Sequence, residues 1–200
     1  MGRRDVIPGV ADSYAAGYTA IVEAFPAAEP IGSTRILVIT GDPLGAKMAG
    51  PAIRAWNMAL ALSNEHDVVL LSTSGHDGID APFRIETVRV GDDRAFSRWA
   101  AWANVIVFQG HAMAQFESLA TSTAIIVADV YDPMHLEQLE QGRELHADTW
   151  DRHVADATDV LNQQLERADF ALCASARQRT FYLGQLAALG RINPANYTDD

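Results

Sequence analysis

The stretch RILVITGDPLGAKMAGPAIRAWNMALAL, residues 35–62, joins a buried strand to an amphipathic helix through a glycine-rich turn. Gly41, Gly45 and Gly50 are expected to allow positive φ and close approach of a ligand, and Pro51 suits the first helical position. A strand, a glycine-rich turn and a helix N-terminus together form a receptor for an anion or a sugar hydroxyl. The turn is therefore a candidate binding site, and an ordinary connecting loop is the alternative interpretation.

Short apolar runs alternate with helical patterns along the rest of the chain. This alternation predicts an α/β fold with a Rossmann-like parallel sheet and helices on both faces. We expect one domain over residues 35–200, preceded by a helical arm over residues 1–34. The predicted strands are RILVIT at 35–40, DVVLLST at 67–73, FRIETVRV at 83–90, NVIVFQG at 104–110, AIIVADVYD at 124–132 and DFALCAS at 169–175.

Helical spacing of apolar residues marks the segments between these strands. Asp148 and Thr149 are the predicted caps of the longest helix, and Gly190 is predicted to end the last one. The helices are expected around 53–61 and over 94–102, 112–119, 148–167 and 176–189.

Composition limits the classes of protein to which the chain can belong. With 200 residues and 48% hydrophobic content, the chain can bury a full core. A net charge of -11 argues against nucleic-acid binding, which usually needs a clustered basic face. The only cysteine, Cys173, cannot form an internal disulfide and is interpreted as a small core residue of a cytoplasmic protein. No apolar run reaches membrane-spanning length, although Arg3 and Arg4 with an amphipathic helix allow peripheral contact with the inner face of the membrane.

Polar residues follow the predicted strands, at the edge where parallel sheets bind ligands. His111 follows the fourth strand and can hydrogen-bond a substrate or act as an acid or base, or it is a polar surface group. Asp129 and Asp132 follow the fifth strand and can hold a polyol through its hydroxyls. Asp132 with Pro133 can instead be a turn and a helix cap.

Several catalytic patterns are missing from the sequence. The histidines and acids at 129–153 match no zinc spacing, so no metal is expected, and no GxSxG elbow is present. A dinucleotide site requires GxGxxG and an acid after the second strand, where this chain has Ser72 and Thr73. The phosphate-binding P-loop pattern also fails, because Lys47 is followed by Met48.

The chain resembles the N-terminal lobe of an actinobacterial-type glycosyltransferase with the GT-B architecture. The resemblance covers nearly everything from Arg35 onward and is most specific in DVYDP, at 129–133, and ASARQRTFYLGQLAALGR, at 174–191. It implies that the lobe holds a glycan or lipid acceptor while a C-terminal lobe binds the nucleotide-sugar donor, with no other cofactor. A hexosyl group would then pass from donor to acceptor.

The resemblance also implies roles for particular residues. The implied catalytic residues are Asp129 and His111, although many retaining relatives have a histidine after the fifth strand. The glycine loop would lie against the donor phosphates or the acceptor. The implied acceptor- or phosphate-binding residues are Gly45, Ala46, Lys47, Gly50, Arg54, Tyr131 and Asp132.

The chain ends at Asp200, about where such enzymes enter the linker to the donor lobe, and the paired glutamates of that lobe are missing. We therefore expect an isolated lobe that folds by itself and transfers sugar poorly or not at all. A non-catalytic Rossmann-like binding or regulatory module is the alternative. A nucleotide or cofactor transferase is a third interpretation, which a phosphate bound at residues 45–50 would support.

Overall fold

The computed structural model describes residues 33–196 and contains one sheet of six parallel strands, in the order β3-β2-β1-β4-β5-β6. Each predicted apolar run supplies one strand, so the predicted Rossmann-like α/β fold is confirmed. The predicted N-terminal arm falls almost entirely outside the described residues. The strands are β1 (Arg35–Thr40), β2 (Asp67–Ser72), β3 (Arg84–Thr87), β4 (Val105–Phe108), β5 (Ile125–Asp129) and β6 (Phe170–Leu172).

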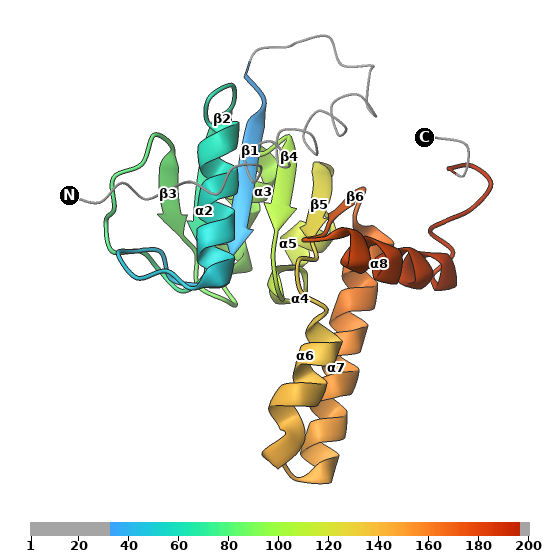
Figure 1. Ribbon diagram of the computed structural model, residues 1–200. Coiled ribbons are helices and arrows are strands. Elements are labelled where there is room, and N and C mark those ends of the chain that lie inside the picture. The colour runs from blue at the N-terminus through green and yellow to red at the C-terminus, as the bar shows by residue number, and fades with distance from the viewer. Residues whose placement is uncertain (1–32, 197–200) are drawn as a thin grey trace.

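Helices cover both faces of the sheet, with α2 on one face and α3 and α5 on the other (Figure 1). Successive residues of a strand point to opposite faces, so β1 contributes to two cores. Ile36 and Val38 pack with α2, whereas Leu37 and Ile39 pack on the opposite side. The helices are α2 (Gly50–Leu62), α3 (Asp93–Trp102), α4 (Ala112–Gln115), α5 (Glu117–Ala120), α6 (Met134–Gln141), the 3-10 turn η1 (Gly142–Glu144), α7 (Ala147–Arg167) and α8 (Ala176–Ala188).

Local packing changes two of the predicted helices. The single helix predicted over 112–119 is two short helices, because Phe116 has an extended backbone and stacks on Phe96 in the core at 4.3 Å between ring centroids. The predicted caps Asp148 and Thr149 lie inside α7, whose N-cap position is His146 without a side-chain hydrogen bond. Gly190 follows α8 with φ of 71°, as predicted for a helix C-terminus.

Helices α6 and α7 form a hairpin that projects beyond the carboxyl ends of the strands (Figure 1). Near its tip, the indole Nε1 of Trp150 donates a hydrogen bond to the carbonyl oxygen of Gln138, 3.2 Å away. Gly142 lies under the same ring, where a methyl group would overlap Trp150. The glycine thus allows α7 to fold back closely on α6.

We expect Gly142→Ala to lower the free energy of unfolding by about 1–3 kcal/mol, because Trp150 must move and lose its hydrogen bond. Urea denaturation measures this change. Gly184→Ala is the matched control: it lies in α8 with open space around it, so alanine should raise stability by about 0.5–1 kcal/mol. Equal stability of the two variants would contradict this role of Gly142.

Candidate functional site

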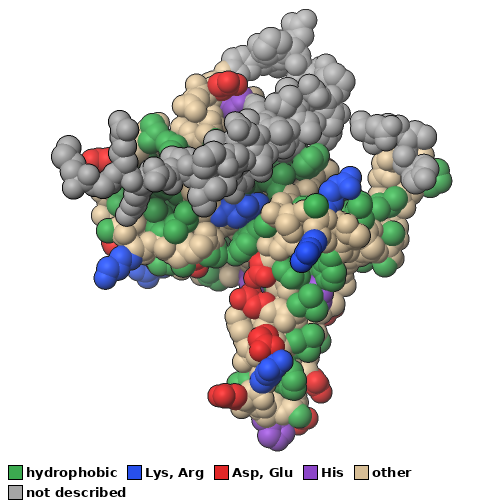
Figure 2. Space-filling model, viewed as in Figure 1, with side chains coloured by type: hydrophobic (Ala, Val, Ile, Leu, Met, Phe, Trp, Pro, Cys, Tyr) green, Lys and Arg blue, Asp and Glu red, His purple; other side chains and the backbone are tan. Residues whose placement is uncertain are grey.

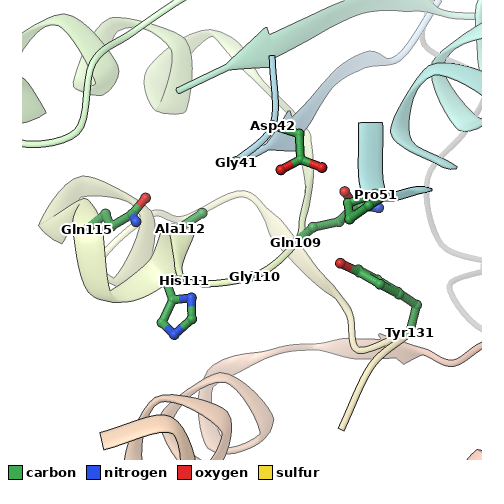
Figure 3. A pocket seen from close by; sticks show the side chains of 9 residues that line it. All are labelled: Gly41, Asp42, Pro51, Gln109, Gly110, His111, Ala112, Gln115 and Tyr131. Carbon is green, nitrogen blue, oxygen red and sulfur yellow. The ribbon is translucent and has the colours of Figure 1, made fainter. Parts of the chain in front are cut away.

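A polar cavity of about 200 Å³ lies at the carboxyl edge of the sheet. The strand order reverses there, because β1 continues to β2 on one side while β4 and β5 extend the sheet on the other. Asp42 follows β1, Gln109 and His111 follow β4, and Tyr131 follows β5, and all four line the cavity. Asp42 and Tyr131 approach the opening from different sides (Figure 3). Three separate turns therefore meet at one site.

The loop between β1 and α2 is fixed by the segment after β2. Leu44 is buried and pairs with this segment: its amide donates to the Gly75 carbonyl at 3.0 Å, and the Asp77 amide donates to the Leu44 carbonyl at 2.9 Å. The Ser72 hydroxyl donates to the Asp42 carbonyl at 2.7 Å. These contacts hold Asp42 at the cavity wall.

The glycines of this loop do not have the predicted backbone. Gly41, Gly45 and Gly50 all lack positive φ, so that prediction is wrong. Gly45 serves close packing instead, since a Cβ there would lie 2.7 Å from Oδ2 of Asp77. Positive φ occurs at Gly110, at 61°, where the chain turns out of β4.

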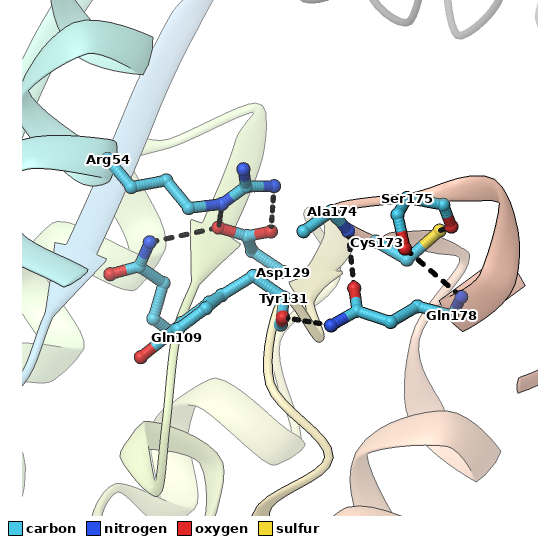
Figure 4. A network of polar contacts seen from close by, with 8 residues as sticks. All are labelled: Arg54, Gln109, Asp129, Tyr131, Cys173, Ala174, Ser175 and Gln178. Atoms are coloured by element: carbon cyan, nitrogen blue, oxygen red, sulfur yellow. Dashed lines mark hydrogen bonds and ion pairs between the residues drawn. The ribbon is translucent and has the colours of Figure 1, made fainter. Parts of the chain in front are cut away.

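A buried ion pair joins α2 to the end of β5. Arg54 donates from Nε and one terminal nitrogen to the two carboxylate oxygens of Asp129, each at 2.7 Å (Figure 4). The Asp129 side chain is fully buried, and its Oδ2 also accepts from Nε2 of Gln109 at 2.9 Å. Such bidentate, charge-assisted pairs have a well-defined geometry. The pair therefore fixes the orientation of Gln109 at the cavity.

Two contacts position Tyr131, one to its main chain and one to its ring. Its carbonyl accepts a hydrogen bond from Nε2 of Gln178 at 2.7 Å, which ties it to the start of α8 (Figure 4). The Arg54 guanidinium lies over its ring, 5.7 Å from the centroid. Burial, followed by the charges of nearby acids including Asp132 and Asp42, raises the pKa of Tyr131 to about 12. Its phenol thus stays protonated and can donate a hydrogen bond to a ligand.

A second cavity of about 150 Å³ adjoins the first and reaches the base of the α6–α7 hairpin. His111 and Tyr131 line both cavities, and Asp132 and Glu137 line the second. The Gln164 side chain of α7 donates to the Gly110 carbonyl, which links the hairpin to the turn before His111. Acidic side chains gather along the hairpin and at its junction with the sheet (Figure 2).

The structure brings together part of the predicted site. His111, Asp129, Tyr131 and Asp132 line the second cavity, and Arg54 joins them through Asp129. The alternative role of Asp132 as a helix cap is not seen, because the N-cap position of α6 is Pro133, without a side-chain hydrogen bond. Four predicted binding residues of the glycine-rich loop line neither cavity, namely Gly45, Ala46, Lys47 and Gly50. Lys47 is exposed.

Sequence reasoning assigned no individual role to Asp42, Gln109, Glu137 or Gln164. Asp42 and Gln109 had a detectable signal, since each is a polar residue just beyond an apolar strand. Glu137 and Gln164 had none, because their helical positions show only that a side chain lies on a face and not that this face reaches the cavity.

Within residues 33–196, no three His, Cys, Asp or Glu side chains are placed to hold a metal ion. No helix in this part of the chain has both the length and the apolar character needed to cross a membrane. Cys173 is partly exposed just after β6, rather than buried in it.

No family model matches the chain, and no curated protein matches it. Among solved structures, the C-terminal domain of the coenzyme A biosynthesis bifunctional protein CoaBC is similar at 11% identity and a TM-score of 0.34, over 56% of this chain and 70% of that one. Shikimate 5-dehydrogenase from Listeria monocytogenes, solved with shikimate and NAD, is similar at 13% identity and a TM-score of 0.37, over 72% of this chain and 56% of that one. Neither is a glycosyltransferase, and at these scores neither indicates what this chain binds.

We expect Asp129→Asn to lower the free energy of unfolding by about 3–5 kcal/mol, because it removes the carboxylate from a bidentate ion pair whose acidic side chain is fully buried. The matched control is Glu86→Gln, which breaks the more exposed pair of Arg84 and Glu86 and should cost less than about 1 kcal/mol. Urea denaturation of both variants measures the difference. If Asp129→Asn lowers the free energy of unfolding no more than the control does, the Arg54–Asp129 pair does not stabilise the fold as predicted.

Glu137 should make stability depend on pH. A hydrogen bond with Asp132, then burial and the charge of Asp132, raise the pKa of Glu137 from 4.5 to about 7. Between these values the folded chain keeps a proton that the unfolded chain releases. The stabilisation by Glu137 is therefore complete below pH 4.5 and is lost as the pH rises through 7.

In the wild type, the loss of the Glu137 proton should lower the urea midpoint as the pH rises from 5 to 8. We expect the Glu137→Gln variant to show a smaller decline over this range. Glu140→Gln is the control, because Glu140 lies on the same helix and pairs with exposed Arg143. The control should keep the wild-type profile. Identical dependence of the urea midpoint on pH in the wild type and Glu137→Gln would contradict the raised pKa of Glu137.

Proposed function

We propose that this domain is the acceptor-binding lobe of a glycosyltransferase that moves a hexosyl group from a nucleotide sugar to a hydroxylated acceptor. One observation carries the assignment: the turns after β1, β4 and β5 meet around a single polar cavity at the carboxyl edge. Two of these turns lie within the region of the resemblance: GDPLGAKMAGP, at 41–51, and the more specific DVYDP, at 129–133. Within the proposed site, His111 and Tyr131 contact the acceptor, and Arg54 and Asp129 position Gln109.

The structure of the β2 end argues against dinucleotide chemistry. In dinucleotide-binding sheets, an acid at this position takes the ribose hydroxyls. Here Ser72 is buried, and its hydroxyl accepts from the amides of Ser74 and Gly75 while donating to the Asp42 carbonyl. The position therefore holds the loop after β1 together and offers no carboxylate to a ribose.

A non-catalytic binding module is the second candidate. The full burial of Asp129 favours it, since a catalytic carboxylate must reach a reacting atom. The two functions differ at His111, which is exposed and lines both cavities. A binding module requires no proton transfer from this side chain, whereas a transferase can use it as an acid or base.

The decisive assay uses the protein encoded by the whole gene, with a panel of nucleotide hexoses and hydroxylated acceptors, and measures nucleoside diphosphate release. We expect acceptor-dependent turnover. His111→Ala should lower kcat/KM by about 10²- to 10⁴-fold, which is the usual contribution of a general acid or base.

His146→Ala is the matched control, because His146 is 80% exposed near the far end of the hairpin. Its kcat/KM should equal that of the wild type. No release of nucleoside diphosphate with any donor would contradict the proposed function. Normal turnover by the His111→Ala variant would show that His111 is not the catalytic acid or base.

A further inference from the structure

We propose that the 200 Å³ cavity selects a neutral, unphosphorylated polyol, such as a single sugar ring, and rejects its phosphorylated form. This inference rests on the proposed function, because it names the part of the acceptor that the same site receives. It depends on which hydrogen-bonding groups of the cavity remain unsatisfied and on where the cationic side chains lie.

Gln109 offers the first unsatisfied acceptor. The residue is buried, with an exposed fraction of 3%, and its Nε2 must face Asp129, because a carboxylate can only accept hydrogen bonds. This contact fixes the orientation of the amide, so Oε1 is the remaining polar atom. Among the described residues, Oε1 has no hydrogen-bond partner. A buried carbonyl oxygen without a donor is costly, and a ligand hydroxyl would satisfy it.

Asp42 offers the second unsatisfied acceptor oxygen. Its main chain is held on both sides, with its carbonyl accepting from Ser72 and its amide donating to Thr40 Oγ1 at 3.4 Å. Its carboxylate lines the cavity, and the buried Oδ2 accepts no hydrogen bond from the described part of the chain. Like Gln109 Oε1, this oxygen can only accept. The Tyr131 phenol adds a group that both donates and accepts.

Lysine and arginine, the side chains that are always charged, are not placed to receive a phosphate here among the described residues. No lysine or arginine lines the cavity. Arg54 is engaged bidentately by Asp129, and exposed Lys47 lies outside the walls. A phosphate group would bring two negative charges near the Asp42 carboxylate and, unlike the hydroxyl that it replaces, would offer no proton donor. A polyol hydroxyl satisfies these oxygens and adds no charge.

The size of the cavity agrees with a ligand of this class. Pockets for drug-sized molecules usually enclose about 300–1,000 Å³. A cavity of about 200 Å³ is smaller and suits a single sugar ring, with the rest of an acceptor extending through the open side.

The experiment titrates the 200-residue chain at pH 7.5 with D-glucose and, separately, with D-glucose 6-phosphate. The amide signals of Gly110 and Ala112 in nitrogen-proton NMR spectra report binding. We expect saturable shifts with glucose and at least about tenfold weaker binding of the phosphate.

Asp42→Asn removes the negative charge and retains an acceptor oxygen, so the preference should fall to within about threefold. Asp77→Asn is the control on the adjacent exposed loop and should keep the wild-type preference. Tighter binding of the phosphate, no binding of either ligand, or an unchanged preference in Asp42→Asn would overturn the inference. If Asp42→Asn does not fold, the wild-type comparison of the two ligands decides.

Failure of this inference is distinguishable from failure of the proposed function. If the whole-gene protein transfers sugar only to phosphorylated acceptors, the polyol preference is wrong and the transferase assignment stands. If the 200-residue chain binds glucose as expected but the whole-gene protein releases no nucleoside diphosphate, the preference stands and the transferase assignment is wrong.

Discussion

The ion pair between Arg54 and Asp129 connects the two sides of the site. Arg54 comes from α2, which packs on β1, and Asp129 ends β5, two strands away in the sheet. Their bidentate contact lies across the end of β4 and takes Gln109 into the same network. A buried carboxylate without a cation is far more costly than a buried neutral side chain, so Asp129 requires Arg54. The orientation of Gln109 and the position of Tyr131 both depend on this pair.

The sheet could be predicted from the sequence because both of its faces are buried. Strands covered on both sides contain nearly continuous apolar runs, and those runs mark the four inner strands clearly. The exceptions are the two edge strands: the predicted runs extend over residues 83–90 and 169–175, but only Arg84–Thr87 and Phe170–Leu172 pair with the neighbouring strand. Edge pairing depends on the neighbouring strand, which local sequence does not describe.

The site could be predicted only as a set of turns. The parallel order of the strands places His111, Asp129 and Tyr131 at one edge. Their contacts depend on side-chain distances that no spacing rule contains. Glycine in the loop after β1 suggested positive φ, but the pairing of Leu44 with the chain after β2 imposes an ordinary backbone there. Tertiary contact therefore overrode local preference at this loop.

The hairpin of α6 and α7 has a mechanical consequence for the cavities. The inner part of α7 is anchored in the core through Leu161 and Leu165, and between them Gln164 holds the Gly110 carbonyl. A helix of 21 residues is about 30 Å long, so its far end lies well away from this anchor. A force on the tip of the hairpin would therefore be transmitted along α7 to the Gly110 turn, beside His111. Contacts made at the tip can in this way affect the turn that shapes the cavities.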